Sequence, residues 1–169
     1  MLTLHVPAGG DAVLVSGTRI AGLGPADALA RAHPGARQRH WAGTVEPGRC
    51  HPGAVRYLEQ TYHPDPREAD TLGSEPLTGS ALPAMDDARW GHSARRGLQR
   101  LLAQGVTSVT GPFTRAAVRT AVRRLGVPVV AAAGPPVLTL GGPAHFAVRA
   151  ADGTCLATVL SGRLVYRRD

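Results

Sequence analysis

The residues best suited to chemistry lie between positions 50 and 70 of the chain. Cys50, His51, His63 and Asp65 stand in this stretch, with Asp70 close behind. Thiolate, imidazole and carboxylate groups are the ligands that zinc accepts in proteins. Their spacing matches no standard ligand motif, so a zinc site would form only if the segment folds back on itself. A zinc ion is the one cofactor that these residues suggest.

The same stretch supports a second interpretation. In His63-Pro-Asp-Pro-Arg-Glu68, the prolines restrict the backbone, and the polar side chains around them face solvent or a partner. A segment with one fixed shape loses little entropy when it binds, which favours recognition over catalysis. A surface loop that caps its own turns is the alternative, and the sequence leaves the two open.

Composition narrows the class of protein. The chain has 169 residues, 43% of them hydrophobic, and a formal net charge of +7. All of its basic residues are arginines, and they are spread along the chain, which argues against a nucleic-acid partner. No apolar run approaches the roughly 18 residues of a membrane span. Cys50 and Cys155 form no paired motif, so we expect a reducing, cytoplasmic location.

Both ends of the chain read as short strands. Near the start, apolar residues alternate in three runs separated by Gly9-Gly10 and Ser16-Gly17, which predicts an antiparallel meander. A short helix over 25–33 and a strand over 37–45 follow. Near the end, turns at Asp152-Gly153 and Ser161-Gly162 predict strands over 146–150, 155–160 and 164–166.

The middle of the chain changes in character at His92. Before it, residues 49–92 read as an irregular arm, with one short helix between His51 and Tyr62. After it, Ser93 is a plausible N-cap for a helix over 94–104. A strand over 106–109, a helix from Thr114 to Leu125 stopped by Gly126, and a strand over 127–131 complete an α-β-α-β unit. We expect its two strands to be parallel.

Four stretches of the chain resemble one known family when taken in order. They are Asp11–Pro25, Val45-Glu-Pro-Gly48, Arg95–Val109 with its Leu-Leu-x-x-Gly-Val-Thr-x-Val pattern, and the back end Ala144–Tyr166, whose tail Ala157–Arg167 resembles the closing strands. Together they resemble the amidohydrolase superfamily, in particular its branch of imidazolonepropionase-like and aminodeoxyfutalosine-deaminase-like enzymes.

The resemblance implies an α/β fold in which both termini build one small domain. Residues 1–48 and 137–169 would form a composite antiparallel β-sandwich, 49–92 the arm, and 93–136 a βα fragment of a reduced barrel. A complete barrel of this kind takes about 250 residues, so only part of one fits here. The open strand edges of such a fragment predict pairing with a second copy or with another protein.

The inherited metal site is the point of departure from the family pattern. In the family, Pro-Gly is followed by His-x-His, whereas here Pro47-Gly48 is followed by Arg49-Cys-His-Pro-Gly53. No two of the seven histidines are two residues apart. By descent the chain would be a hydrolase of C–N bonds other than peptide bonds, without an independent active site and with an accessory or interaction role. The alternative is a small metal-dependent hydrolase whose rebuilt site lies in the arm, and whether the chain is an enzyme stays open.

Overall fold

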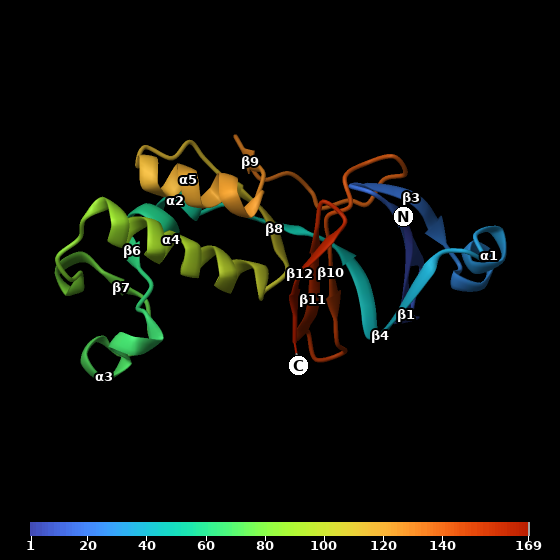
Figure 1. Cartoon of the computed structure of the whole chain (residues 1–169), viewed down its shortest axis with the longest axis horizontal. Coiled ribbons are helices and arrows are strands. Elements are labelled where there is room, and N and C mark those ends of the chain that lie inside the picture. The colour runs from blue at the N-terminus through green and yellow to red at the C-terminus, as the bar shows by residue number, and fades with distance from the viewer. Residues whose placement is uncertain (169) are drawn as a thin grey trace. The chain divides into compact units, whose positions relative to one another are not determined.

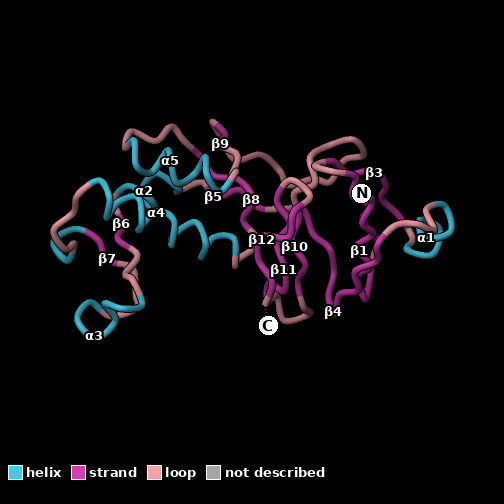
Figure 2. The backbone as a smooth tube through the Cα atoms, in the orientation of Figure 1, coloured by secondary structure: helices cyan, strands magenta, loops and turns pink. Residues whose placement is uncertain are grey.

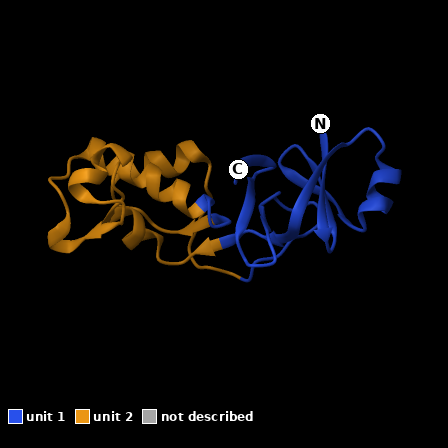
Figure 3. Cartoon of the chain, turned by 90° about the horizontal axis from the view of Figure 1, so that it is seen from below, with its two compact units in different colours: residues 1–49, 102–107, 135–169 blue, residues 50–101, 108–134 orange. Residues whose placement is uncertain are grey.

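The computed structural model describes residues 1–168, which divide into two compact units (Figure 3). Unit 1 consists of residues 1–49, 102–107 and 135–168, so it joins the two ends of the chain. Unit 2 consists of residues 50–101 and 108–134. Within the described residues, no helix is long and apolar enough to cross a membrane.

Unit 1 is built around one sheet of seven strands (Figures 1 and 2). Its elements are β1 (Leu2–Gly9), β2 (Ala12–Ser16), β3 (Arg19–Gly24), α1 (Ala26–Ala32), β4 (Arg37–Pro47), β10 (Phe146–Arg149), β11 (Cys155–Leu160) and β12 (Arg163–Arg167). The strand order is β12-β11-β10-β4-β1-β2-β3. The predicted joining of the two termini in one structure is therefore confirmed at the level of a shared sheet, with β4 beside β10.

The sheet is mixed rather than wholly antiparallel. The predicted meander is confirmed, because β1 pairs with β2 and β2 with β3 in antiparallel register. Strand β4, however, lies parallel to β1, with Thr3 opposite Arg37. Helix α1 separates these two strands in the sequence, and its crossover lets β4 return in the same direction as β1.

Two apolar clusters stabilise unit 1. In one, Val13, Ile20, Phe146 and Val159 pack together from strands at opposite ends of the chain. In the other, Leu4 and its neighbours lie beneath the apolar side of α1. Side chains alternate between the two faces of a strand, so β2 contributes Val13 to the first cluster and Leu14 to the second. The second cluster packs α1 against one face of the sheet.

A close contact between two turns joins the ends of the chain further. Gly162 has a φ of +73°, and a Cβ built there would lie 2.0 Å from the carbonyl oxygen of Gly17. The turn after β11 therefore tolerates only glycine where it meets the turn after β2.

The remaining elements lie mostly in unit 2. They are β5 (Arg49–His51), α2 (Ala54–Glu59), β6 (Thr61–Tyr62), η1 (Pro66–Glu68), α3 (Ala69–Leu72), β7 (Leu77–Thr78), η2 (Gly79–Ala81), α4 (Asp87–Leu102), β8 (Val106–Thr110), α5 (Ala116–Leu125) and β9 (Val129–Val130). Strands β5, β8 and β9 form a three-stranded sheet, and β6 pairs with β7. The fold as a whole is mixed α/β. The predicted parallel pairing of the two strands after α4 is confirmed for β8 and β9.

Helix α4 begins earlier than the sequence predicted. It starts at Asp87, so Ser93 lies inside the helix and is not its N-cap. The buried Ser93 hydroxyl instead accepts a hydrogen bond from the backbone N–H of His63, at 2.9 Å. The predicted end of α5 is confirmed, because Gly126 adopts the left-handed conformation with φ of 72° and donates its backbone N–H to the carbonyl oxygens of Val122 and Arg123.

Candidate functional site

The four predicted zinc ligands occupy two places in unit 2. Cys50 and His51 lie in β5, His63 follows β6, and Asp65 precedes η1. Within residues 1–168, no group of three or more His, Cys, Asp or Glu side chains lies close enough to hold a metal ion. The Tyr57 ring lies between the two histidines, since its centroid is 5.1 Å from that of His51 and 4.5 Å from that of His63. A zinc site made of these residues stays a prediction.

His63 is fully buried and held from two sides. Its Nε2 lies 2.9 Å from the carbonyl oxygen of Tyr57, and because a carbonyl only accepts, Nε2 carries the proton. Gly97 of α4 makes room for the ring, since a Cβ there would lie 2.6 Å from Nε2. Burial lowers the pKa of His63, partly opposed by the bond to Tyr57 and reinforced by the nearby arginine charges. The ring is therefore neutral, and Nδ1 is buried without a hydrogen-bond partner in the described chain.

Asp65 and Glu68 organise the short η1 helix between them. An Asp65 carboxylate oxygen accepts from the backbone N–H of Arg67 at 3.0 Å, and Glu68 accepts from the backbone N–H of Asp65 at 3.3 Å. This reciprocal arrangement is a capping box, which satisfies N–H groups that the first turn of a helix leaves free. Asp65 is thus placed by the local sequence, with Pro66 at the first position of the turn.

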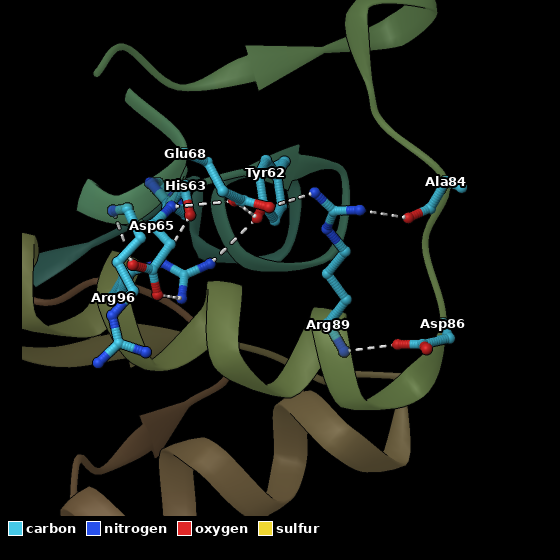
Figure 4. Close-up of polar contacts among 9 residues, drawn as sticks. Tyr62, His63, Asp65, Glu68, Ala84, Asp86, Arg89 and Arg96 are labelled. Atoms are coloured by element: carbon cyan, nitrogen blue, oxygen red, sulfur yellow. Dashed lines mark hydrogen bonds and ion pairs between the residues drawn. The ribbon is translucent and has the colours of Figure 1, made fainter. Parts of the chain in front are cut away.

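Two arginines of α4 join this turn to the rest of unit 2. Arg89 donates to Glu68 Oε1 at 2.6 Å, and Arg96 donates to Asp65 Oδ2 at 3.2 Å (Figure 4). Arg96 also donates from Nε to the backbone carbonyl of His63 at 2.7 Å. The Tyr62 hydroxyl donates to Glu68 Oε2. We call Tyr62, Asp65, Glu68, Arg89 and Arg96 the arm cluster.

The Tyr62 ring is the centre of the arm cluster. The Arg89 and Arg96 guanidinium carbons lie 4.9 and 5.6 Å from its centroid. Both distances lie within the range of cation–π attraction. Tyr62 itself is 1% exposed, so the two arginines cover a buried ring while their charged ends reach the carboxylates.

The electrostatics of the arm cluster favour ionised carboxylates. The hydrogen bond from Tyr62 lowers the pKa of Glu68, with further contributions from the Asp65 N–H and from Arg89. The bond from the Arg67 N–H lowers the pKa of Asp65, helped by Arg96. At neutral pH both are therefore charged acceptors whose oxygens are already bonded. Such groups hold a shape well and serve poorly as proton acceptors in a reaction.

Sequence reasoning missed Tyr62, Arg89 and Arg96. A signal for the arginines was present, because residues seven apart on a helix lie on the same face. Nothing in the sequence indicated which segment that face would meet. Glu59 lies in the same segment as the candidate ligands and was not among them. It is 5% exposed, and its carboxylate accepts from Thr114 Oγ1 at 3.0 Å and from the Arg115 N–H at 2.6 Å, at the start of α5.

Comparison with known families supports the resemblance of the front end. Residues 12–36 match the family described as imidazolonepropionase-like composite domain, bacteria. This segment holds β2, β3 and α1 of unit 1. The predicted resemblance to an imidazolonepropionase-like protein is confirmed for this segment, through its composite domain. No curated protein matches the sequence.

Several solved structures of amidohydrolase type are similar to part of the chain. An amidohydrolase from an environmental sample of the Sargasso Sea is 18% identical with a TM-score of 0.46, over 77% of this chain and 33% of its own. A guanine deaminase from Bradyrhizobium japonicum is 21% identical with a TM-score of 0.43, over 70% and 27%. A zinc-bound adenosine deaminase from Xanthomonas campestris is 18% identical with a TM-score of 0.48, over 76% and 31%. The chain thus spans about a third or less of the length of these proteins.

Proposed function

We propose that this chain is an amidohydrolase-related protein that acts by binding a partner, rather than as an independent catalyst. By descent it would be classed with hydrolases of C–N bonds other than peptide bonds. In this proposal the seven-stranded sheet is the composite sandwich of that family, and residues 93–136 are its reduced barrel portion. The partner is a second copy of the chain or another protein.

The observation that carries the proposal is that all four carboxylate oxygens of Asp65 and Glu68 already accept hydrogen bonds. Glu68 Oε1 accepts from Arg89, and Oε2 accepts from Tyr62 and from the Asp65 N–H. The Asp65 oxygens accept from the Arg67 N–H and from Arg96. A metal ion at either carboxylate would have to displace an arginine. The same bonds hold the arm in one shape and leave Arg67 and Asp70 exposed for contact.

The second candidate function is a small metal-dependent hydrolase, and one observation favours it. The Nδ1 atom of the neutral His63 ring carries a lone pair that no described residue uses. A neutral imidazole nitrogen is a common zinc ligand. The Tyr57 ring lies between His63 and His51, and His51 would be the second ligand.

Metal content and activity of the purified chain separate the two functions. If the chain has an accessory role, the purified protein should contain well below one zinc ion per chain. It should also show no histidine-dependent hydrolysis of cyclic amides or of ring amines. His51→Ala and His63→Ala are compared with His40→Ala, which changes an exposed histidine of β4 in unit 1. One zinc per chain, lost together with activity in the first two variants and retained in the third, would establish the hydrolase instead.

A further inference from the structure

Unit 2 contains a cavity that lies outside the arm cluster and differs from it in chemistry. It has a volume of about 410 Å³, and its walls include Arg56, Glu59, Thr78, Leu82, Trp90 and Arg115. Its residues come from α2, from the hairpin of β6 and β7, and from the starts of α4 and α5. The volume is within the range of sites that hold small groups.

The cavity carries a net positive charge, because two arginines, Arg56 and Arg115, face it together with one carboxylate, that of Glu59. Arg56 and Arg115 are exposed, and neither forms an ion pair with a carboxylate among the four pairs of the described chain. Arg115 donates from Nε to the backbone carbonyl of Glu59 at 3.2 Å, and its terminal nitrogens make no hydrogen bond within residues 1–168. The Glu59 carboxylate is buried and is already bonded at the start of α5. The Arg56 guanidinium and the terminal nitrogens of Arg115 therefore have donors left for an anion.

An apolar wall lies beside these charges. The Arg115 guanidinium lies 4.4 Å above the ring of Trp90, which is 5% exposed. Leu82 extends the wall from the segment that follows η2. Tryptophan and arginine are enriched among the residues that dominate binding energy at protein interfaces.

The cavity is held in shape before any ligand arrives. Thr61 of β6 pairs with Thr78 of β7, which fixes one wall. The Glu59 carboxylate bonds the first residues of α5, which fixes the position of Arg115. A preformed site loses less entropy on binding.

We propose that this cavity receives an acidic side chain, next to an apolar one, from the protein partner. The carboxylate would bind Arg56 and Arg115, and the apolar neighbour would pack on Leu82, beside the Trp90 ring that Arg115 covers. A guanidinium pairs with a carboxylate through two parallel hydrogen bonds, which gives such a contact direction as well as strength. This inference rests on the proposed interaction role and names the chemistry of the partner.

The test uses the full chain and two small peptides, acetyl-leucyl-glutamyl amide and the matched acetyl-leucyl-glutaminyl amide. The chain has two tryptophans, so its indole N–H signals in NMR spectra are readily assigned. Titration with the glutamyl peptide should shift the Trp90 indole signal in a saturable way. Trp41, which belongs to unit 1 and donates to His5, should stay unchanged and serves as the internal control.

Two arginine variants sharpen the result. Arg56→Gln should weaken binding of the glutamyl peptide by about tenfold, because a charge-assisted pair is lost. Arg123→Gln removes the same charge from α5 outside the cavity and should leave binding unchanged. No saturable shift at Trp90, equal binding of both peptides, or equal weakening by both variants would overturn the inference. The proposed interaction role is tested independently of this inference, by the zinc content and activity of the purified chain.

Discussion

Two buried polar side chains, His5 in unit 1 and Tyr62 in unit 2, have different surroundings. In unit 1, His5 is 2% exposed and accepts a hydrogen bond from the Trp41 indole at 3.2 Å, with the Phe146 ring edge-on at 4.9 Å. Its surroundings are apolar or neutral except for the charge of Arg39. In unit 2, Tyr62 is equally buried but lies among two arginines and two carboxylates.

The difference indicates which part of the molecule is a scaffold and which is adaptable. Apolar burial across strands from both ends of the chain stabilises unit 1, and it responds little to salt. The arm of unit 2 depends on charge-assisted bonds at a partly exposed position, which salt and acid weaken. The predictions below test that contrast, beginning with the largest effect.

The apolar core of unit 1 should show the largest response to mutation. Phe146 is fully buried, so Phe146→Ala should lower the free energy of unfolding by about 3–5 kcal/mol through lost burial and a cavity. Leu23→Ala, at a position that is 37% exposed, should cost about 0.5 kcal/mol or less. Urea denaturation measures both, and equal costs would contradict the described core.

His5 should make unit 1 sensitive to moderately acidic pH. Burial, reinforced by Arg39, lowers the pKa of His5 to about 4. Between about pH 6.5 and the folded pKa, only the unfolded chain binds the proton, so stability is complete above this window and falls as pH decreases through it. The loss should approach about 3 kcal/mol.

The matched variants for this prediction are His5→Gln and His40→Gln. His5→Gln keeps an acceptor for Trp41 without titrating, so the difference in unfolding free energy between pH 7 and pH 4.5 should shrink. His40→Gln changes an exposed histidine of β4 and should keep the dependence of the original chain. An unchanged dependence in His5→Gln would show that His5 titrates normally.

Arg96 should be the most sensitive position of the arm cluster. Arg96→Gln removes the bonds to Asp65 and to the His63 carbonyl. We expect a loss of about 1–2 kcal/mol, because the ion pair is partly exposed. Arg95→Gln, the exposed neighbour on α4, is the control and should be close to neutral. Thermal unfolding compares the two, and similar small changes would mean that the arm is held by other contacts.

Lowering the pH should increase the amide exchange of the arm, and this is the smallest effect that we expect. The pKa values of Asp65 and Glu68 are lowered in the folded chain, so their contribution is present above the unfolded values and is lost as pH falls through the folded ones. The Arg67 amide should therefore begin to exchange faster below about pH 4. Glu68→Gln should weaken this dependence, whereas Glu75→Gln, an exposed acid of the same segment, should preserve it.

Local signals in the sequence were enough to predict much of the secondary structure. Gly126 ends α5 as predicted, because its left-handed conformation lets its N–H donate to the carbonyl oxygens of the last helical turn. The turns near Asp152 and Ser161 also separate the strands that they were expected to separate. Each of these features depends on a few neighbouring residues.

Features that depend on distant residues were not predictable in the same way. The start of α4 was misplaced because Ser93 has the chemistry of an N-cap, yet its hydroxyl serves His63, thirty positions earlier. The parallel pairing of β1 with β4 joins strands on either side of a helix. In the candidate site, Asp65 was anticipated as a polar group, but its partner Arg96 comes from another element.

Hydrogen exchange of the arm amides, with and without a strong zinc chelator, tests most directly whether the arm cluster orders the arm. The amides to follow are Asp65, Arg67, Glu68 and Gly73, whose acceptors all lie within the arm. We predict that chelation leaves their exchange unchanged and that Arg96→Gln accelerates it several-fold. If chelation alone exposed these amides, a metal ion would be holding the arm, and the interaction role proposed for it would be contradicted.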